Sequence, residues 1–213
     1  MSGYVGDVVA LARKDLLLEL RARDTLPAML LFVVSTLVVF HFALPQGAGD
    51  DAAYGLLWVA LVFTALLGLA RAWVPEREHA ALDGLVLATG DRSAIWLAKT
   101  VAALAFLGAA EVVALPAFAV LFAPLDAAAV LGVVLASVGI CVVGTLASAM
   151  AAAGRGREVI LPLLVLPLSI PLVVGGVGAS VSSEPRTYVA FLCLYDAVFA
   201  ILSWASFEYV VTE

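Results

Sequence analysis

Charged side chains are scarce in this sequence. Asp, Glu, Lys and Arg make up 13% of its 213 residues, whereas a soluble globular domain carries about 25%. Hydrophobic residues reach 64%, and the mean hydropathy is +1.13. These values exclude an ordinary soluble domain. The net charge of −6 also argues against a nucleic-acid partner, which would require a basic surface.

Motifs for catalysis and nucleotide binding are missing as well. The sequence has no GxxxxGK[ST] phosphate loop and no HExxH, GxSxG or CxxC motif. Only two cysteines occur, Cys141 and Cys193, and both fall within apolar runs. We expect them to be small buried side chains rather than a disulfide or metal pair. We therefore predict no catalytic residues and no metal site, so that any ATP hydrolysis belongs to another chain.

Six long apolar runs dominate the sequence. About 20 apolar residues are needed to cross the bilayer core as a helix. Backbone polar groups in lipid must be satisfied internally, and a β-barrel would show alternating segments of about 10 residues rather than continuous runs. We predict an all-α polytopic membrane protein with a single transmembrane domain over residues 1–213. The expected spans are Leu26–Leu44, Tyr54–Val74, Ile95–Phe122, Ala127–Ala153, Val159–Gly178 and Tyr188–Val211.

The basic residues indicate an orientation. Of the 11 Lys and Arg, all but Arg186 precede the first span or lie around the second and fourth connectors. The excess of basic residues marks the cytoplasmic side of a membrane protein. We therefore expect a multi-pass protein of the plasma (inner) membrane, with both termini in the cytoplasm.

The segment before the first span, residues 4–24, has two kinds of surface. Apolar and charged residues recur at helical spacing on different sides of it, namely Val5, Val8, Ala12, Leu16 and Leu20 against Asp7, Lys14 and Arg21. This pattern predicts an amphipathic helix lying on the lipid bilayer at its cytoplasmic face. A short soluble helix without a partner remains the alternative.

A charged connector, Arg71–Lys99, joins the second and third runs. Its central part, residues 75–94, is typical of a segment that a cytoplasmic partner protein grips. We expect a short helix from Pro75 to Leu87, because Pro suits the first turn and acidic residues near the N-terminus favour the helix dipole. A solvated connector held by its own charge pairs is the alternative. The candidate coupling residues are Glu76, Arg77, Glu78, Asp83 and Arg92.

Two acidic residues fall inside apolar runs. Glu111 lies near the middle of the third run, where a charged side chain costs about 2.5–3.5 kcal/mol on insertion scales. It is therefore expected to face the bundle or water, in a pathway or in a packing network. Asp196 is the second candidate, placed towards one end of the sixth run, where reaching the membrane interface is the alternative role. His41, at the outer end of the first run, is either a haem ligand or a polar anchor.

The fifth run carries three prolines, Pro162, Pro167 and Pro171. Each removes a backbone hydrogen bond and tends to kink a helix, so we predict a bent or locally unwound span that lines a pathway or moves. A merely kinked packing helix is the alternative. We expect this span to pack against the fourth run near Gly144 and Ser148, where small residues recur every four positions.

Four segments together resemble the CcmB family, the membrane subunit of the haem-exporter ABC complex of cytochrome c maturation. They are RKDLLLELRAR at Arg13–Arg23, LLGLARAWVPEREHAALDGLVLATGDRSAIWLAK at Leu66–Lys99, VILPLLVLPLSIPLVV at Val159–Val174 and FEYVVTE at Phe207–Glu213. The resemblance covers essentially the whole chain. It departs from the family at Ala80, where a Gly is expected, and in its short outer loops.

The resemblance implies an ABC-2-like permease that works with a separate cytoplasmic ABC ATPase and with other membrane subunits of the maturation complex. A second copy of the chain, as a homodimer, is compatible with it. Haem is expected as a transported or handled ligand and not as a firmly bound cofactor. Two alternatives stay open at this stage. They are an ABC-2-type permease for another substrate, and a membrane scaffold of the maturation complex that transports nothing.

Overall fold

The computed structural model describes residues 2–45, 49–74, 84, 91–153 and 157–212. Within these residues the chain is helical, and six of its helices are long and apolar enough to cross a bilayer. The predicted all-α architecture with six spans is therefore confirmed. The helices are α1 (Ser2–Ala22), α2 (Thr25–Ala43), α3 (Asp50–Arg71), α6 (Ser93–Leu121), α7 (Ala127–Ala153), α8 (Arg157–Val181) and α9 (Pro185–Thr212).

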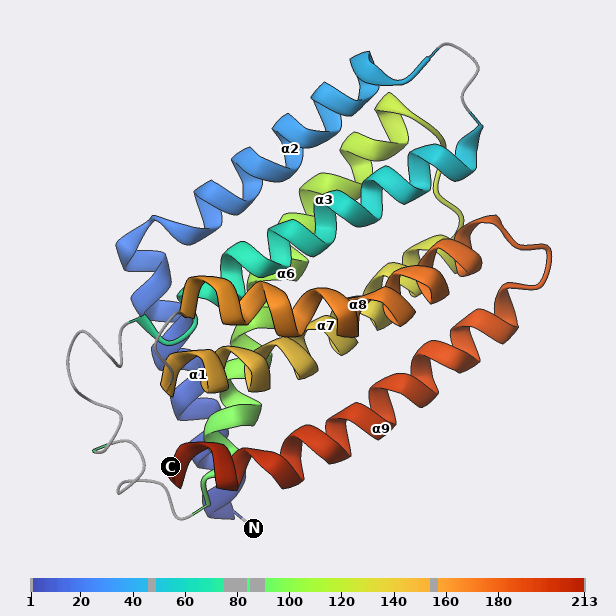
Figure 1. Ribbon diagram of the computed structural model, residues 1–213. Helices are drawn as coiled ribbons and strands as arrows, with labels where there is room; N and C mark the ends of the chain where they lie inside the picture. Colours follow the sequence, from blue (N-terminus) through green and yellow to red (C-terminus); the bar gives the residue numbers. More distant parts are fainter. Residues whose placement is uncertain (1, 46–48, 75–83, 85–90, 154–156, 213) are drawn as a thin grey trace.

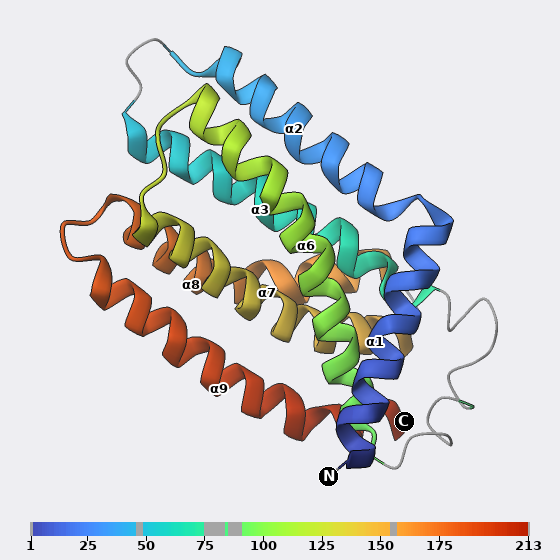
Figure 2. The same cartoon turned by 180° about the vertical axis from the view of Figure 1, so that it is seen from behind.

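Helices α3 and α7 form the centre of the bundle, as Figures 1 and 2 show. Helix α7 packs chiefly against α8 and α9 and also contacts α6 and α3, whereas α2 lies at one edge on α3 and α6. The most hydrophobic windows of α3 and α7 are mostly buried, and those of α2 and α9 are mostly exposed. An apolar helix that leaves most of its surface uncovered by protein requires lipid or another membrane subunit around it.

The bundle has two distinct ends. Both termini and helix α1 lie at one of them, which we call the α1 end (Figure 1). The far end holds the short connections from α2 to α3, α6 to α7 and α8 to α9. Aromatic side chains pack at the far end, where the ring centroids of Tyr54 and Phe118 are 5.4 Å apart and those of His41 and Phe122 are 5.5 Å apart. His41 is exposed and contacts Phe122, so its placement suits the anchor that was one of the two expected roles.

A sharp corner joins α1 to α2. Arg23 has a φ of 58°, a left-handed conformation that is uncommon for a residue with a side chain. The N–H of Arg23 donates to the carbonyl of Glu19 at 3.0 Å, which closes the end of α1. The Glu19 carboxylate in turn accepts a 3.0 Å hydrogen bond from the N–H of Thr25 and so caps the start of α2. Since Pro27 falls in the first turn of α2, its missing N–H does not interrupt the helix.

Helix α1 lies alongside the first half of α6 (Figure 2). Ala12 is buried on this side, while Val5, Val9 and Leu20 remain exposed on another. The exposed apolar residues suit contact with lipid, and the position of α1 on a membrane surface stays a prediction.

Candidate functional site

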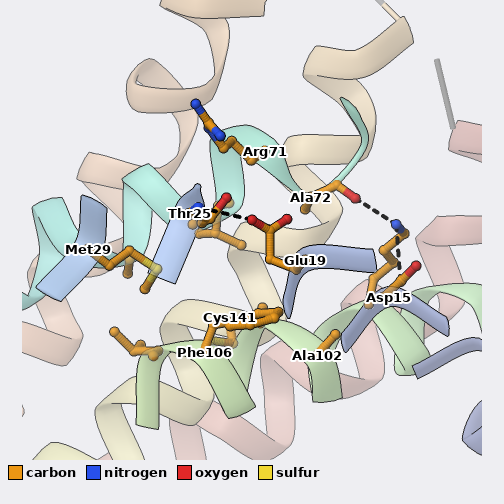
Figure 3. Close-up of a pocket in the computed structure, with 15 residues that line it drawn as sticks. Asp15, Glu19, Thr25, Met29, Arg71, Ala72, Ala102, Phe106 and Cys141 are labelled. Atoms are coloured by element: carbon orange, nitrogen blue, oxygen red, sulfur yellow. Dashed lines mark hydrogen bonds and ion pairs between the residues drawn. The ribbon is translucent and has the colours of Figure 1, made fainter. Parts of the chain in front are cut away.

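The principal polar cluster of the α1 end is built around Lys99, in the second turn of α6. This side chain is only 4% exposed. Its Nζ lies 3.1 Å from Oδ2 of Asp15 on α1 and donates a 2.6 Å hydrogen bond to the carbonyl of Ala72, directly after α3 (Figure 3). A buried charge is tolerated only where a partner charge and hydrogen bonds offset its desolvation. We call Lys99, Asp15, Ala72 and Trp73 the lysine cluster.

Trp73 extends the lysine cluster to α7. The Lys99 ammonium lies 5.0 Å from the centroid of the Trp73 ring, within the range of a cation–π contact. The indole Nε1 donates a 2.9 Å hydrogen bond to Oγ of Ser148 on α7, and the ring stacks on Phe207 of α9. Through these contacts one residue at the end of α3 touches α6, α7 and α9. A displacement of this end of α3 would therefore change contacts with α6, α7 and α9.

Helix α1 also contacts the start of α6. The Tyr4 hydroxyl and the Ser93 hydroxyl form a 3.2 Å hydrogen bond, and the Asp91 carboxylate accepts hydrogen bonds from the N–H and the hydroxyl of Ser93 at 2.9 and 2.7 Å. The described residues on the two sides of the connector end at Val74 and resume at Asp91, apart from Gly84. Asp15 is linked through Lys99 to Ala72, before the connector. Tyr4 contacts Ser93, after it. Helix α1 therefore bridges the two ends of the connector.

A cavity lies beneath α1, and Figure 3 shows it from the side. Its volume is about 50 Å³. Asp15 and Glu19 line it at partly exposed positions, and Thr25, Leu107 and Cys141 line it at buried positions. The Thr25 hydroxyl is buried and has no hydrogen-bond partner among the described residues. The cavity is too small for haem or for any organic molecule of comparable size.

A polar seam joins α6 and α7 below the lysine cluster. The hydroxyls of Thr100 and Thr145 form a 2.8 Å hydrogen bond. Further along the same two helices, the Ser137 hydroxyl donates to the carboxylate of Glu111, which is 7% exposed. The expected inward orientation of Glu111 is therefore confirmed, and its role stays a prediction.

Asp196 lies in the middle of α9, so its expected place towards an end of the span is wrong. The side chain is 9% exposed, and neither carboxylate oxygen has a hydrogen-bond partner among the described residues. It points at Gly139 of α7, where a Cβ built on the glycine would come within 2.5 Å of Oδ1. The absence of a side chain at Gly139 thus makes room for this carboxylate.

The proline-bearing helix α8 remains helical through Pro162, Pro167 and Pro171. Of the two predicted forms, bent or locally unwound, the unwound one is therefore wrong, and bending or mobility of this span stays a prediction. Hydroxyl groups bond to carbonyls between the prolines: Ser169 donates to Leu166 at 2.8 Å, and Tyr195 of α9 donates to Leu168 at 2.7 Å. These carbonyls are not the ones four residues before a proline, so the hydroxyl bonds do not replace the backbone hydrogen bonds that the prolines remove.

Helix α8 packs against α7, as predicted, but the two small residues named for the contact, Gly144 and Ser148, have their nearest partners on or directly after α3. A Cβ on Gly132 would meet Ala179 and Gly176 of α8, whereas the space over Gly144 is filled by Leu69 of α3. Ser148 likewise bonds to Trp73. The small residues of α7 therefore face two neighbours in turn, because a repeat of four residues drifts around a helix with 3.6 residues per turn.

Of the predicted coupling residues, Glu76, Arg77, Glu78 and Asp83 lie outside the described residues, as does all but Gly84 of the helix expected from Pro75 to Leu87. Arg92 is half-buried at the start of α6. Sequence reasoning did not single out Lys99 or Asp15 as a pair. The available signal was a lysine several residues inside an apolar helix, since such a residue requires a buried partner.

The two cysteines have different environments. Cys141 is buried, as expected, whereas Cys193 is exposed on α9, so the expectation of burial for Cys193 is wrong. Within the part of the chain that the structure describes, no group of three or more His, Cys, Asp or Glu side chains could hold a metal ion.

Comparison with known proteins gives a consistent family. The relatives found include three proteins called Heme exporter protein B. That of Paracoccus denitrificans (strain Pd 1222) is 29% identical over 192 residues, covering 86% of this chain and 88% of the relative. Those of Bradyrhizobium diazoefficiens and Pseudomonas aeruginosa are each 28% identical, over 181 and 176 residues, and cover 79% and 78% of their own lengths. The model of the CcmB protein family matches residues 7–209, so the chain belongs to the CcmB family.

Proposed function

We propose that this chain is the permease subunit of an ABC transporter complex in cytochrome c maturation, where it exports haem or helps to release a haem-loaded chaperone. The observation that carries this proposal is the similarity to three proteins named Heme exporter protein B over most of both chains. The six apolar helices and the lack of a phosphate-binding motif support a membrane subunit that depends on a separate ATPase. Haem is the cargo in this proposal and not a resident cofactor.

Deletion of the gene tests the function directly. Covalent haem in c-type cytochromes should fall to background in the deletion strain and return when the intact gene is supplied. Haem staining that stays normal would refute a role in maturation. A permease for another substrate would leave the cytochromes intact while changing the export of a different compound.

The motor contact is proposed to be the connector, residues 75–94. In the sequence it is a charged segment between two apolar runs, and helix α1 contacts the bundle on both sides of it. A force applied to the connector would therefore reach α3, α6 and α1 together. Charge reversal by Glu76→Lys and Glu78→Lys should weaken co-purification of the ATPase while the chain still inserts. Glu184→Lys, an exposed change at the far end, is the matched control.

The α1 end is proposed to be cytoplasmic, in the inner membrane. Basic residues concentrate in the segments that meet at this end, as the positive-inside rule requires. Single cysteines at Ser2 and Asp50, introduced after Cys141→Ser and Cys193→Ser, should respond oppositely to an impermeant thiol reagent. Labelling of position 2 in intact cells would reverse the orientation.

A further inference from the structure

The cavity beneath α1 leads towards Glu111. Along α6 its lining runs from Lys99 to Leu107, a distance of roughly 12 Å at 1.5 Å per residue. Glu111 follows Leu107 by one helical turn. On α7, which runs in the opposite direction, Cys141 lines the cavity and Ser137, the partner of Glu111, follows one turn deeper. Only one turn of each helix therefore separates the inner end of the cavity from the Glu111 carboxylate.

The chemistry of the cavity suits water. A cavity needs a volume of about 10–15 Å³ and 2–4 polar partners to hold one water molecule, and the volume of this cavity is about 50 Å³. Asp15 and Glu19 provide carboxylates at partly exposed positions, and Thr25, only 4% exposed, contributes a hydroxyl without a partner among the described residues. A buried hydroxyl left unpaired is costly, and a bound water removes that cost.

We propose that this cavity holds a short file of water molecules and makes Glu111 a protonation site that is reached from the α1 end of the bundle. The carboxylate accepts a proton from the water file and returns it there, with the Ser137 hydroxyl holding its orientation. This inference goes beyond the transport role and does not depend on it, because it concerns water and protons in this chain alone.

The charged groups around Glu111 favour access from one side. On α1, Asp15 and Glu19 line the cavity, and Lys14 is paired with Asp15. On α6 itself, Lys99 lines it. Helix α7 presents the Cys141 thiol. Asp196 of α9 faces Gly139, which is two residues from Ser137 and hence on another side of α7. On α2 and α3, His41 and Tyr54 lie at the far end. Arg71, at the other end of α3, lines the cavity and lies 3.7 Å from the carboxylate of Asp24.

Cys141 is a built-in reporter of water in the cavity. In the full-length chain carrying Cys193→Ser, reconstituted in nanodiscs, Ag⁺ serves as a thiol probe close to water in size. Cys141 should react with Ag⁺. Ala103→Leu, which fills the cavity, should slow this reaction by about tenfold, which corresponds to an increase of 1.4 kcal/mol in the free energy of opening the cavity. Ala105→Leu, on the exposed side of the same helix, is the matched control and should not change the rate. An unreactive Cys141 would overturn the proposal.

Infrared difference spectroscopy tests Glu111 itself. A carboxyl band that titrates with pH should disappear in Glu111→Gln and persist in Asp196→Asn, and its hydrogen–deuterium exchange should slow in Ala103→Leu. Thr25→Val, which keeps the shape and removes the hydroxyl, gives a second slowed variant if the larger side chain prevents folding. No titrating band that depends on Glu111, or exchange unaffected by both cavity variants, would show that water does not reach this carboxylate through the cavity.

Discussion

Removal of the Lys99 ammonium should destabilise the bundle strongly. In Lys99→Met the Asp15 carboxylate, whose side chain is 10% exposed, loses its 3.1 Å partner, and the Ala72 carbonyl loses a 2.6 Å hydrogen bond. Breaking a buried ion pair by deleting one partner costs about 3–5 kcal/mol. Asp15 keeps Lys14 at 2.9 Å. We therefore expect a loss of free energy of unfolding near the lower value, about 3 kcal/mol.

A double-mutant cycle separates the pair from its surroundings. Asp15→Leu alone leaves a buried ammonium that still contacts Ala72 and Trp73, and should also destabilise the chain. The double variant Lys99→Met with Asp15→Leu buries no unpaired charge, so it should recover much of the loss, with a coupling of about 1–3 kcal/mol. Lys14→Met, whose parent side chain is 35% exposed, is the control and should change the stability by less than about 1 kcal/mol.

The assay is unfolding of the purified chain by a denaturing detergent in mixed micelles, followed by tryptophan fluorescence. Trp73, one of the four tryptophans of the chain, lies 5.0 Å from the ammonium, so part of the emission change comes from the lysine cluster. Co-purification of the ATPase from each variant tests whether the same cluster supports the motor contact. If the stability lost in the double variant equals the sum of the losses in the two single variants, the contact contributes nothing measurable. That result, or a Lys99→Met variant as stable as the parent chain, would refute the reasoning.

Three further substitutions follow from close packing. Gly176→Ala should lower the free energy of unfolding by about 1–3 kcal/mol, because its Cβ would overlap the fully buried Trp58 ring. Gly108→Ala, with nothing within 4 Å, should be neutral or stabilising by up to about 1 kcal/mol, and equal losses at both glycines would contradict the packing argument. Trp73→Phe should lower stability by about 1 kcal/mol through the lost hydrogen bond to Ser148, and unfolding is followed by the emission of the remaining tryptophans. An unchanged stability would contradict a contribution from this hydrogen bond.

The six spans were predictable because hydrophobic length is a local property. Each run had to be a helix in lipid, and the observed helices agree with the predicted spans to within four residues at every boundary. The family was likewise recognisable from local segments, and the match over residues 7–209 confirms it. The inward orientation of Glu111 followed from the cost of a carboxylate in lipid, which no neighbouring residue along the chain can change.

The partners of the buried groups were not predictable in the same way. Pairs such as Lys99 with Asp15, Trp73 with Ser148 and Glu111 with Ser137 join residues 26 to 84 positions apart, and helical periodicity gives the side on which a residue lies but not the helix that meets it. For that reason the contacts of Gly144 were predicted wrongly.

Sequence alone determined that this chain crosses a membrane as six helices, that it belongs to an exporter family and that its charges gather in particular connectors. These properties depend on the composition of contiguous segments and on the solvent they require. Only the tertiary structure decided that α1 spans both ends of the connector, that Lys99 is buried between three helices and that a cavity approaches Glu111. Such features depend on how helices pack side by side, and packing is set by side chains that are distant in the sequence and adjacent only in space.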